Sequence, residues 1–519
     1  MLEEIKGKRL EIYGQISIYE GFPYYHYEIT EPSLTPEEKE LKNTFRDFLT
    51  HQITIEDILN GAGKLYTKTF AEEFREKIVK PISTYDSKEI LLKKEDYNKV
   101  KTELVQLIVK HFPKITNPTL IAEGILSESV GYGKIQQLLI DENLEEIMIN
   151  GYEKNVFVFH RKYGHCKTNI NYADKKELDL ILKRIASTVG RKFDQQNPFI
   201  DARLPDGNRS NATYSFITPY GPCLTIRKFT PKPMSIIDLI NKKTITTEAA
   251  AFLWLMTEGY GVDPMNIIVT GGSSSGKTTT LNALGNFIRY SERVITIEDT
   301  LELQLGNRDN WVQMEARLGI SGQAEVTMDD LLKNSLRMRP DRLILGEVRG
   351  KEAETLFIAM DTGHRGCMGT LHSNSPKEMM IRLKNPPMNV SEVLLPLLNI
   401  IILQYRIYIK GVGIQRRVLS ISEVTSMDQK PLIANIFEWD KETDTLVRTK
   451  VPSSLVEKLA AMTLKTKKEI ETEITIRKKI LEWMIKNNIT AQSEVETIIQ
   501  QYYYDPESIL LKILNPNSE

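Results

Sequence analysis

The chain has 519 residues, of which 41% are hydrophobic, and its 68 Lys and Arg against 69 Asp and Glu leave a formal net charge of −1. At roughly 150 residues per domain this length predicts about three or four domains, and the balanced charge argues against a protein that coats nucleic acid. The three cysteines, Cys166, Cys223 and Cys367, are odd in number and far apart, which excludes a disulfide framework and a four-cysteine zinc site and indicates a reduced, cytosolic protein.

No segment is apolar over a length that could cross a bilayer. The most apolar run, residues 394–403, contains Pro396 and Asn399 and is far shorter than the roughly 20 residues of a spanning helix. The N-terminus is charged and has no apolar core of the kind found in secretory signals. We therefore expect a cytoplasmic protein that reaches the cytoplasmic membrane only through partners.

Residues 1–83 form the first expected region, an N-terminal extension that is partly helical. The first part is rich in aromatic and turn-forming residues, and a helix is predicted to begin at Pro36. Proline suits the first turn of a helix, and Glu37 and Glu38 would lie near its positive end.

Residues 84–229 are expected to form an α+β domain. Its first half has apolar residues at helical spacing, as at Leu104, Leu107 and Ile108. Its second half has short apolar or alternating runs bounded by turn residues. Strands are predicted over 146–150, 156–159 and 224–229.

Residues 230–236 contain two prolines, Pro231 and Pro233, and are expected to form an interdomain linker, although an ordinary surface loop would have the same composition. Residues 237–430 alternate short aliphatic runs with stretches long enough for crossover helices, which predicts a parallel sheet buried on both faces. The runs are 267–269, 294–297, 343–345 and 400–403. Residues 431–519 are expected to be mostly helical.

Residues 271–278 read GGSSSGKT and match the phosphate-loop pattern G-x-x-x-x-G-K-[ST]. The match follows one predicted strand and opens a predicted helix, so backbone N–H groups and the helix N-terminus would converge on phosphate. A Gly/Ser-rich turn is the alternative, and it does not account for this context. The pattern predicts an ATP site with Mg²⁺, in which Lys277 reaches the phosphates and Thr278 ligates the metal. The other predicted binding residues are Gly272, Ser273, Ser274, Ser275, Gly276 and Thr279.

Acidic residues follow two of the predicted strands. Glu347 comes after 343–345, and Glu298, Asp299 and Glu302 come at the end of 294–297. Ligands bind at the C-terminal ends of such strands, so Glu347 could order the hydration shell of Mg²⁺ and the second group could polarise the attacking water. A single acid at a strand end would more simply cap a helix.

Histidine and arginine supply further candidates. His372 ends another short apolar run and could sense a γ-phosphate, although a structural role is equally consistent with the local sequence. Transfer of a phosphoryl group needs positive charge, and Arg203, Arg209 and Arg227 flank a turn and the linker just before the core. Solvated surface arginine is the alternative for each of them.

In this order the motifs resemble the secretion-ATPase superfamily, which includes the ATPases of type II secretion, type IV pilus assembly and the archaellum motor. The resemblance covers about residues 120–430. In the first half of the chain it depends on 131–151, which resembles the start of the family's N-terminal domain, and on the arginine-bearing segments 201–209 and 225–229. In the second half, 296–303 is similar to the Asp box, 343–349 to an atypical Walker B and 363–372 to the His box.

The resemblance implies an α/β protein: a RecA-like P-loop ATPase domain preceded by an α+β domain, assembled as a homo-hexamer with ATP between the two domains. It implies Glu302 as general base, Glu347 as the magnesium-water ligand, and Arg203, Arg209 and Arg227 as residues that reach the phosphates. Leu301 departs from the proline common in the Asp box. Residues 27–32 and the absence of a four-cysteine module favour the archaeal branch.

The implied function is ATP hydrolysis that powers assembly of a type IV pilus-like filament, whether an archaeal pilus, an archaellum or a secretion pseudopilus. The direct partner would be a polytopic membrane platform protein, and pilin-like subunits would be moved indirectly. Three alternatives stay open: a nucleic-acid translocating motor, which the net charge of −1 disfavours; a retraction ATPase; and a small-molecule kinase.

Overall fold

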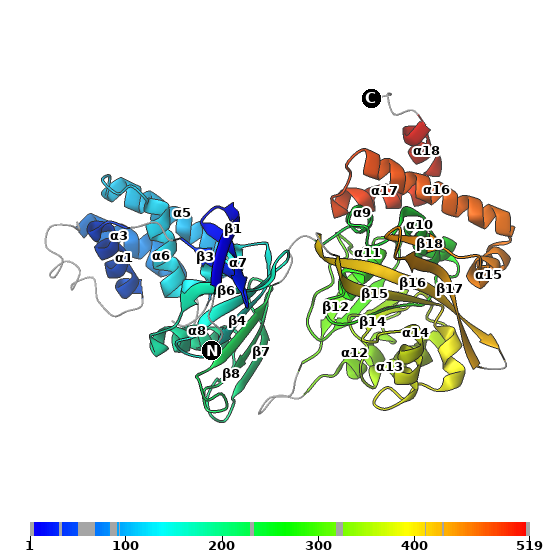
Figure 1. Cartoon of the computed structure of the whole chain (residues 1–519), viewed down its shortest axis with the longest axis horizontal. Coiled ribbons are helices and arrows are strands. Elements are labelled where there is room, and N and C mark those ends of the chain that lie inside the picture. Colours follow the sequence, from blue (N-terminus) through cyan, green and yellow to red (C-terminus); the bar gives the residue numbers. More distant parts are fainter. Residues whose placement is uncertain are drawn as a thin grey trace. The chain divides into compact units, whose positions relative to one another are not determined.

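The computed structural model describes residues 5–30, 34–49, 68–83, 91–92, 94–228, 233–317, 325–409, 412–427 and 430–514. The chain divides into two compact units, Met1–Thr230 and Pro231–Glu519 (Figure 1). Residues 230–232 of the expected linker, together with Phe229, lie outside the described residues, and Ser235 already caps the first helix of the second unit.

The first unit contains a nine-stranded sheet in the order β1-β2-β3-β6-β5-β4-β9-β8-β7. Its strands are β1 (Ile5–Tyr13), β2 (Ile16–Phe22), β3 (Tyr25–Ile29), β4 (Leu144–Asn150), β5 (Asn155–His160), β6 (Gly164–Asn171), β7 (Phe199–Arg203), β8 (Arg209–Thr213) and β9 (Cys223–Arg227). The strands predicted around 146–150, 156–159 and 224–229 are confirmed as β4, β5 and β9. Strands β1–β3 were not predicted; they join the sheet through the pairing of β3 with β6, and Ile18 and Tyr27 are fully buried in its core.

Helices pack on this sheet and beside it. Helix α8 (Lys175–Thr188) shares a hydrophobic core with the inward-facing residues of β4, β7, β8 and β9, so the other face of these strands remains accessible. A second core joins helices through Phe45, Phe70 and Leu104. Among the described residues, this unit also contains α1 (Pro36–Leu49), which begins at the predicted proline, α3 (Lys68–Phe74), α4 (Lys80–Ser83), α5 (Lys94–His111), α6 (Pro118–Val130) and α7 (Gln136–Ile140).

The second unit contains a nine-stranded sheet in the order β12-β11-β13-β14-β10-β15-β16-β17-β18. The strands are β10 (Ile267–Thr270), β11 (Val294–Glu298), β12 (Trp311–Glu315), β13 (Arg342–Leu345), β14 (Met368–Leu371), β15 (Ile400–Ile409), β16 (Gly413–Met427), β17 (Lys430–Asp440) and β18 (Thr445–Arg448). Strands β10–β15 pair in parallel, as predicted, and β16–β18 continue the sheet in antiparallel fashion. The sheet thus extends past residue 430, where a mostly helical region was expected.

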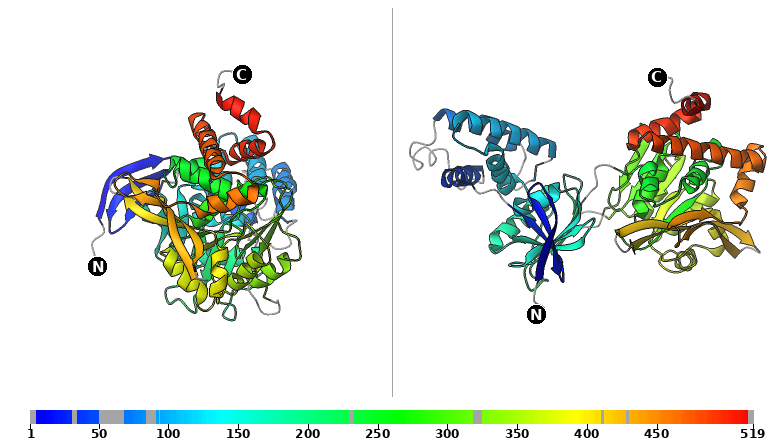
Figure 2. Two further views of the ribbon diagram at one scale, coloured as in Figure 1. Left: turned by 90° about the vertical axis from the view of Figure 1, so that its right-hand side faces the viewer. Right: turned by 45° about the horizontal axis from the view of Figure 1, so that its top comes forward.

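Helices cover both faces of this sheet, which explains the continuous apolarity of its strands (Figures 1 and 2). Ile267 and Val269 of β10 face one core, and Ile268 between them faces the other. The first core includes α9 (Ile236–Asn241), α10 (Thr247–Glu258), α11 (Lys277–Gly285), α15 (Ser454–Thr463), α16 (Lys467–Lys486), α17 (Gln492–Tyr504) and α18 (Pro506–Leu514); the second includes α12 (Met328–Ser335), α13 (Glu352–Asp361) and α14 (Pro376–Lys384). Within the described residues no helix has the length and apolarity needed to span a membrane.

Candidate active site

The phosphate-loop segment connects β10 to α11, as its sequence predicts. Gly271 has a backbone φ of 154°, and a Cβ at this position would overlap the carbonyl oxygen of Gln404 on the neighbouring strand β15. Gly276 has a φ of 94°, and its Cβ would lie 2.9 Å from Gln404 Nε2. Gly272 has open space around it. The loop therefore needs glycine where it passes β15, because a side chain there would push it away from the sheet.

Lys277 begins α11, and its ammonium group folds back over the loop. The residue is 8% exposed, and its Nζ donates to the carbonyls of Gly271 and Gly272 over 3.1 and 3.0 Å. The same Nζ lies 3.2 Å from Nε2 of His372. The predicted lysine and histidine are thus brought together from positions 95 residues apart.

His372 also connects the loop to the predicted Walker B acid. Its Nε2 lies 3.3 Å from Oε1 of Glu347. A neutral Nε2 accepts from Lys277, whereas a protonated Nε2 donates to Glu347, so this nitrogen serves one partner at a time. The three side chains form a continuous path of a cation, an imidazole and a carboxylate.

Strand register explains why these residues meet. Thr270 pairs with Leu371 across β10 and β14, and Leu345 pairs with Gly369 across β14 and β13, so the C-terminal ends of the three parallel strands lie at one edge. The Thr370 hydroxyl donates to the carbonyl of Gly346 over 2.6 Å. Gly346 and Glu347 are therefore held at the C-terminal edge of the sheet, which is where open α/β sheets bind ligands.

Glu298 ends β11 and lies beneath this edge. It is 2% exposed, and its Oε2 accepts hydrogen bonds from the backbone N–H groups of Glu302 and Leu303 over 2.8 and 3.0 Å. Burial is the main cause that raises the pKa of Glu298 to about 7. The two backbone hydrogen bonds oppose this rise, and the negative charge of Glu302 contributes to it. Oε1 has no hydrogen-bond partner among the described residues. The carboxylate closes the turn that carries Glu302, in the segment where Leu301 departs from the family's proline.

Asp299, the remaining acidic candidate, pairs with an arginine that follows β13. Asp299 forms an ion pair with Arg349. The carboxylate of Glu352 accepts from the backbone N–H groups of Arg349 and Gly350 over 2.7 and 2.6 Å, which fixes the turn after Glu347. Asp299 is therefore engaged in holding this turn.

The three predicted arginines of the first unit form one row. Arg203 pairs with Arg209 across β7 and β8, and Arg209 pairs with Arg227 across β8 and β9. Directly paired residues share a face, and here it is the face opposite the α8 core. Arg209 is oriented by Asp201, which accepts two hydrogen bonds of 3.1 and 2.9 Å from its guanidinium. The phosphate loop belongs to the second unit, so the arginines and the loop lie in different units.

Three residues at the phosphate loop were not predicted from the sequence. The Thr280 hydroxyl of α11 donates to Oε1 of buried Gln404 over 2.7 Å. Arg416 on β16 donates from Nε to the carbonyl of Ser274 over 3.1 Å. Gln404 directly follows the apolar run 400–403, so a polar residue after a predicted strand was an available signal, whereas Arg416 lies on an antiparallel strand that no motif marked.

The residues present fit a nucleoside triphosphate with magnesium. The Ser275 hydroxyl is buried inside the loop and has no hydrogen-bond partner in the described part of the chain. No group of three or more His, Cys, Asp or Glu among the described residues could hold a metal by itself. Magnesium is typically held by one or two carboxylates together with substrate phosphates and water, and Thr278 and Glu347 are the donors available for that arrangement.

The model of the family described as "Type II/IV secretion system protein" matches residues 128–483, and the chain belongs to this family. Two uncharacterized proteins of Methanocaldococcus jannaschii are 32% and 33% identical to the chain; the alignments cover 73% and 92% of the chain and 76% and 85% of those proteins. A conjugal transfer protein, TrbB of Rhizobium radiobacter, is 29% identical over 54% of the chain and 82% of its own length. The predicted membership of the secretion-ATPase superfamily, with archaeal relatives, is confirmed.

Solved structures of this superfamily are also similar to the chain. The VirB11 ATPase of the Brucella suis type IV secretion system is 23% identical, with 56% of the chain and 92% of that protein covered and a TM-score of 0.29. The pilus retraction motor PilT with bound ADP is 20% identical, with 64% and 89% covered and a TM-score of 0.41. The predicted fold class, a RecA-like P-loop ATPase domain preceded by an α+β domain, is confirmed by the two sheets described above.

Proposed function

We propose that the chain is a homo-hexameric ATPase that hydrolyses ATP with Mg²⁺ and powers assembly of a type IV pilus-like filament, in an archaeal pilus, an archaellum or a pseudopilus. It would act on a polytopic platform protein of the cytoplasmic membrane and move pilin-like subunits indirectly. The observation that carries the proposal is the path from Lys277 through His372 to Glu347 at one edge of a parallel sheet.

The loop and α11 would hold the phosphates. Backbone N–H groups of residues 272–279 converge where the loop meets the helix N-terminus, which favours an anion. Lys277 Nζ, which now contacts two loop carbonyls and His372, would exchange one of these three partners for a phosphate oxygen. The buried Ser275 hydroxyl supplies a further group with unused hydrogen-bonding capacity.

The acidic residues would then manage metal and water. Thr278 and Glu347 would hold Mg²⁺, directly or through water, and the bound metal would supply positive charge beside the phosphates. Glu302 would orient and deprotonate the attacking water, and Glu298 fixes the backbone of Glu302 for that role. The row of Arg203, Arg209 and Arg227 would stabilise the charge that develops on the transferred group.

Phosphate release by the purified chain tests this proposal. We expect Lys277→Ala and Glu347→Gln each to lower ATP turnover by about 100-fold or more, because each removes a charged contact to the phosphates or their metal. Lys467→Ala and Glu457→Gln are the matched controls, since these residues form a salt bridge on the surface. Turnover at the wild-type level in both test variants would refute the proposal.

The names of the conjugal transfer relatives keep the nucleic-acid motor as a second candidate. A motor that translocates DNA would show DNA-stimulated turnover with a steep dependence on salt, because phosphate contacts release counterions. We expect turnover to be independent of added DNA. We also expect the mass of the chain with ATP, measured by light scattering, to be that of a hexamer.

A further inference from the structure

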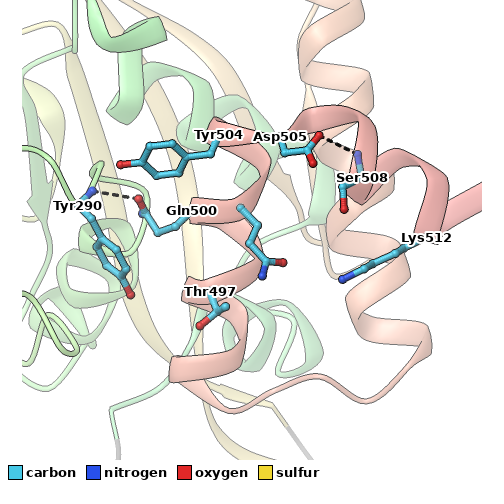
Figure 3. Close-up of a pocket in the computed structure, with 8 residues that line it drawn as sticks. Tyr290, Thr497, Gln500, Tyr504, Asp505, Ser508 and Lys512 are labelled. Atoms are coloured by element: carbon cyan, nitrogen blue, oxygen red, sulfur yellow. Dashed lines mark hydrogen bonds between the residues drawn. The ribbon is translucent and has the colours of Figure 1, made fainter. Parts of the chain in front are cut away.

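Helix α17 lies beyond residue 483, where the family match ends, yet it contacts the segment that directly follows α11. After α11, the carbonyl of Phe287 accepts from the Tyr503 hydroxyl over 2.8 Å, and that of Ile288 accepts from Gln500 Nε2 over 2.8 Å. Gln500 also accepts from the backbone N–H of Tyr290 over 2.9 Å (Figure 3). Side chains of α17 thus hold the segment that follows α11.

The same helix also contacts the segment that carries Glu302. Gln492 Nε2 donates to the carbonyl of Gln304 over 2.9 Å and to Oδ1 of Asn286 over 3.1 Å. From the other side, the backbone N–H of Gln304 donates to Oδ1 of Asn282 on α11 over 2.7 Å. Gln304, two residues after Glu302, is therefore held between α11 and α17.

A buried ion pair fixes the next part of this segment. The side chains of Arg308 and Glu496 are 2% and 1% exposed and lie 3.3 Å apart. Gly306 has a φ of 70°, and a Cβ there would overlap the carboxylate of Glu496. Arg308 also donates to the carbonyl of Gly285, the last residue of α11, over 3.1 Å. The backbone of 304–308 follows the surface of α17 closely.

We infer that α17 positions the catalytic groups of the proposed ATPase, with Gln492 and Glu496 as positioning residues. The inference rests on the proposed function. Glu302 must lie at a set distance from the phosphates, and these are held at the first turn of α11 by Lys277. Because α17 contacts both the segment that follows α11 and the segment that follows Glu302, it fixes the position of Glu302 relative to α11. A misplacement of about 1 Å at a reacting group can lower a rate by about 100-fold.

The test compares two glutamines of one helix. Gln492→Met keeps the length of the side chain but removes both donated hydrogen bonds, whereas Gln501→Met alters an exposed position of α17. For Gln492→Met we expect kcat for ATP to fall by about 10-fold while KM stays within about 2-fold, because Lys277 and the phosphate loop are unchanged. Gln501→Met should match the wild type. Hydrogen–deuterium exchange should rise at residues 302–306 in Gln492→Met alone.

Glu496→Gln provides a second, shape-conserving variant, and it should show the same loss of kcat with KM retained. Wild-type kcat in both variants would overturn the inference, and so would equal losses of kcat and nucleotide affinity accompanied by general unfolding, which would indicate a merely structural role. A wild-type chain that releases no phosphate would overturn the proposed function and this inference together. Normal variants beside an active wild type would overturn the inference alone.

Discussion

Replacing Glu298 by glutamine should stabilise the second unit at neutral and alkaline pH. Both backbone N–H groups that bind this residue donate to one oxygen, Oε2, and Oε1 has no hydrogen-bond partner among the described residues. The amide oxygen of Glu298→Gln can accept both hydrogen bonds, while its nitrogen takes the position of Oε1. The variant therefore keeps the turn and removes a buried charge.

The sign and size follow from proton linkage. Because the pKa of Glu298 is higher in the folded chain, the fold holds the proton more tightly and loses stability as the pH rises from the unfolded value of 4.5 to about 7. At about 1.4 kcal/mol per pKa unit, the full loss is about 3 kcal/mol, and about 2.5 kcal/mol of it falls between pH 5 and pH 8. The variant does not titrate, so its free energy of unfolding should exceed that of the wild type by a margin that grows with pH.

Chemical denaturation followed by tryptophan fluorescence measures this margin. All four tryptophans, Trp254, Trp311, Trp439 and Trp483, belong to the second unit, so the signal reports on the unit that contains Glu298. Burial also raises the pKa of Glu496 to about 7, but Glu496 titrates in both proteins and cancels in the difference. Parallel curves for wild type and variant from pH 5 to pH 8 would show that Glu298 is not a buried acid of raised pKa.

Three further predictions concern the phosphate loop and the arginine row. Gly271→Ala should abolish nucleotide binding and lower the free energy of unfolding by about 2–4 kcal/mol, because its Cβ would overlap Gln404. Gly272→Ala is the control: this position has open space around it, so the free energy of unfolding in the same denaturation assay should change by less than about 0.5 kcal/mol. Gln404→Leu leaves the Thr280 hydroxyl without its acceptor and should lower stability by about 1–3 kcal/mol. Arg209→Lys should lower kcat by about 10-fold or more in steady-state assays while binding of a fluorescent ADP is retained; unchanged kcat would remove this arginine from the proposed mechanism.

The sequence predicted the parallel strands of the second unit well because its signals are local. Each short aliphatic run became a strand, and parallel pairing places the residues that follow these runs at the C-terminal edge of the sheet. Glu347 and His372 lie at this edge, and the loop after β10 brings Lys277 to them. Parallel pairing does not reveal that Glu298 turns inward: the carboxylates of Glu298 and Glu302 look alike in sequence, and only packing beneath Gly346 separates a buried acid from an accessible one.

Other features depend on contacts between distant residues, and local patterns carried no signal for them. Strands β1–β3 lie near the start of the chain, and their place in the sheet is fixed by the pairing of β3 with β6, about 140 residues later. Strand β17 follows the expected boundary at residue 430 but pairs with β16. The contact of α17 with the segment after α11 joins positions more than 200 residues apart, and glutamine has no strong local preference that would predict such a contact.

Lys277 provides the last step in relating this geometry to the proposed reaction. An ammonium group has three N–H donors, and Gly271, Gly272 and His372 offer three acceptors within hydrogen-bonding distance. A phosphate oxygen would compete best with His372, because an anion attracts the ammonium more strongly than a neutral imidazole does. Released from Lys277, Nε2 could take a proton and donate to Glu347, 3.3 Å away. Binding of the phosphate and orientation of Glu347 would then be linked through a single nitrogen atom, so the acid would be set in place when nucleotide arrives.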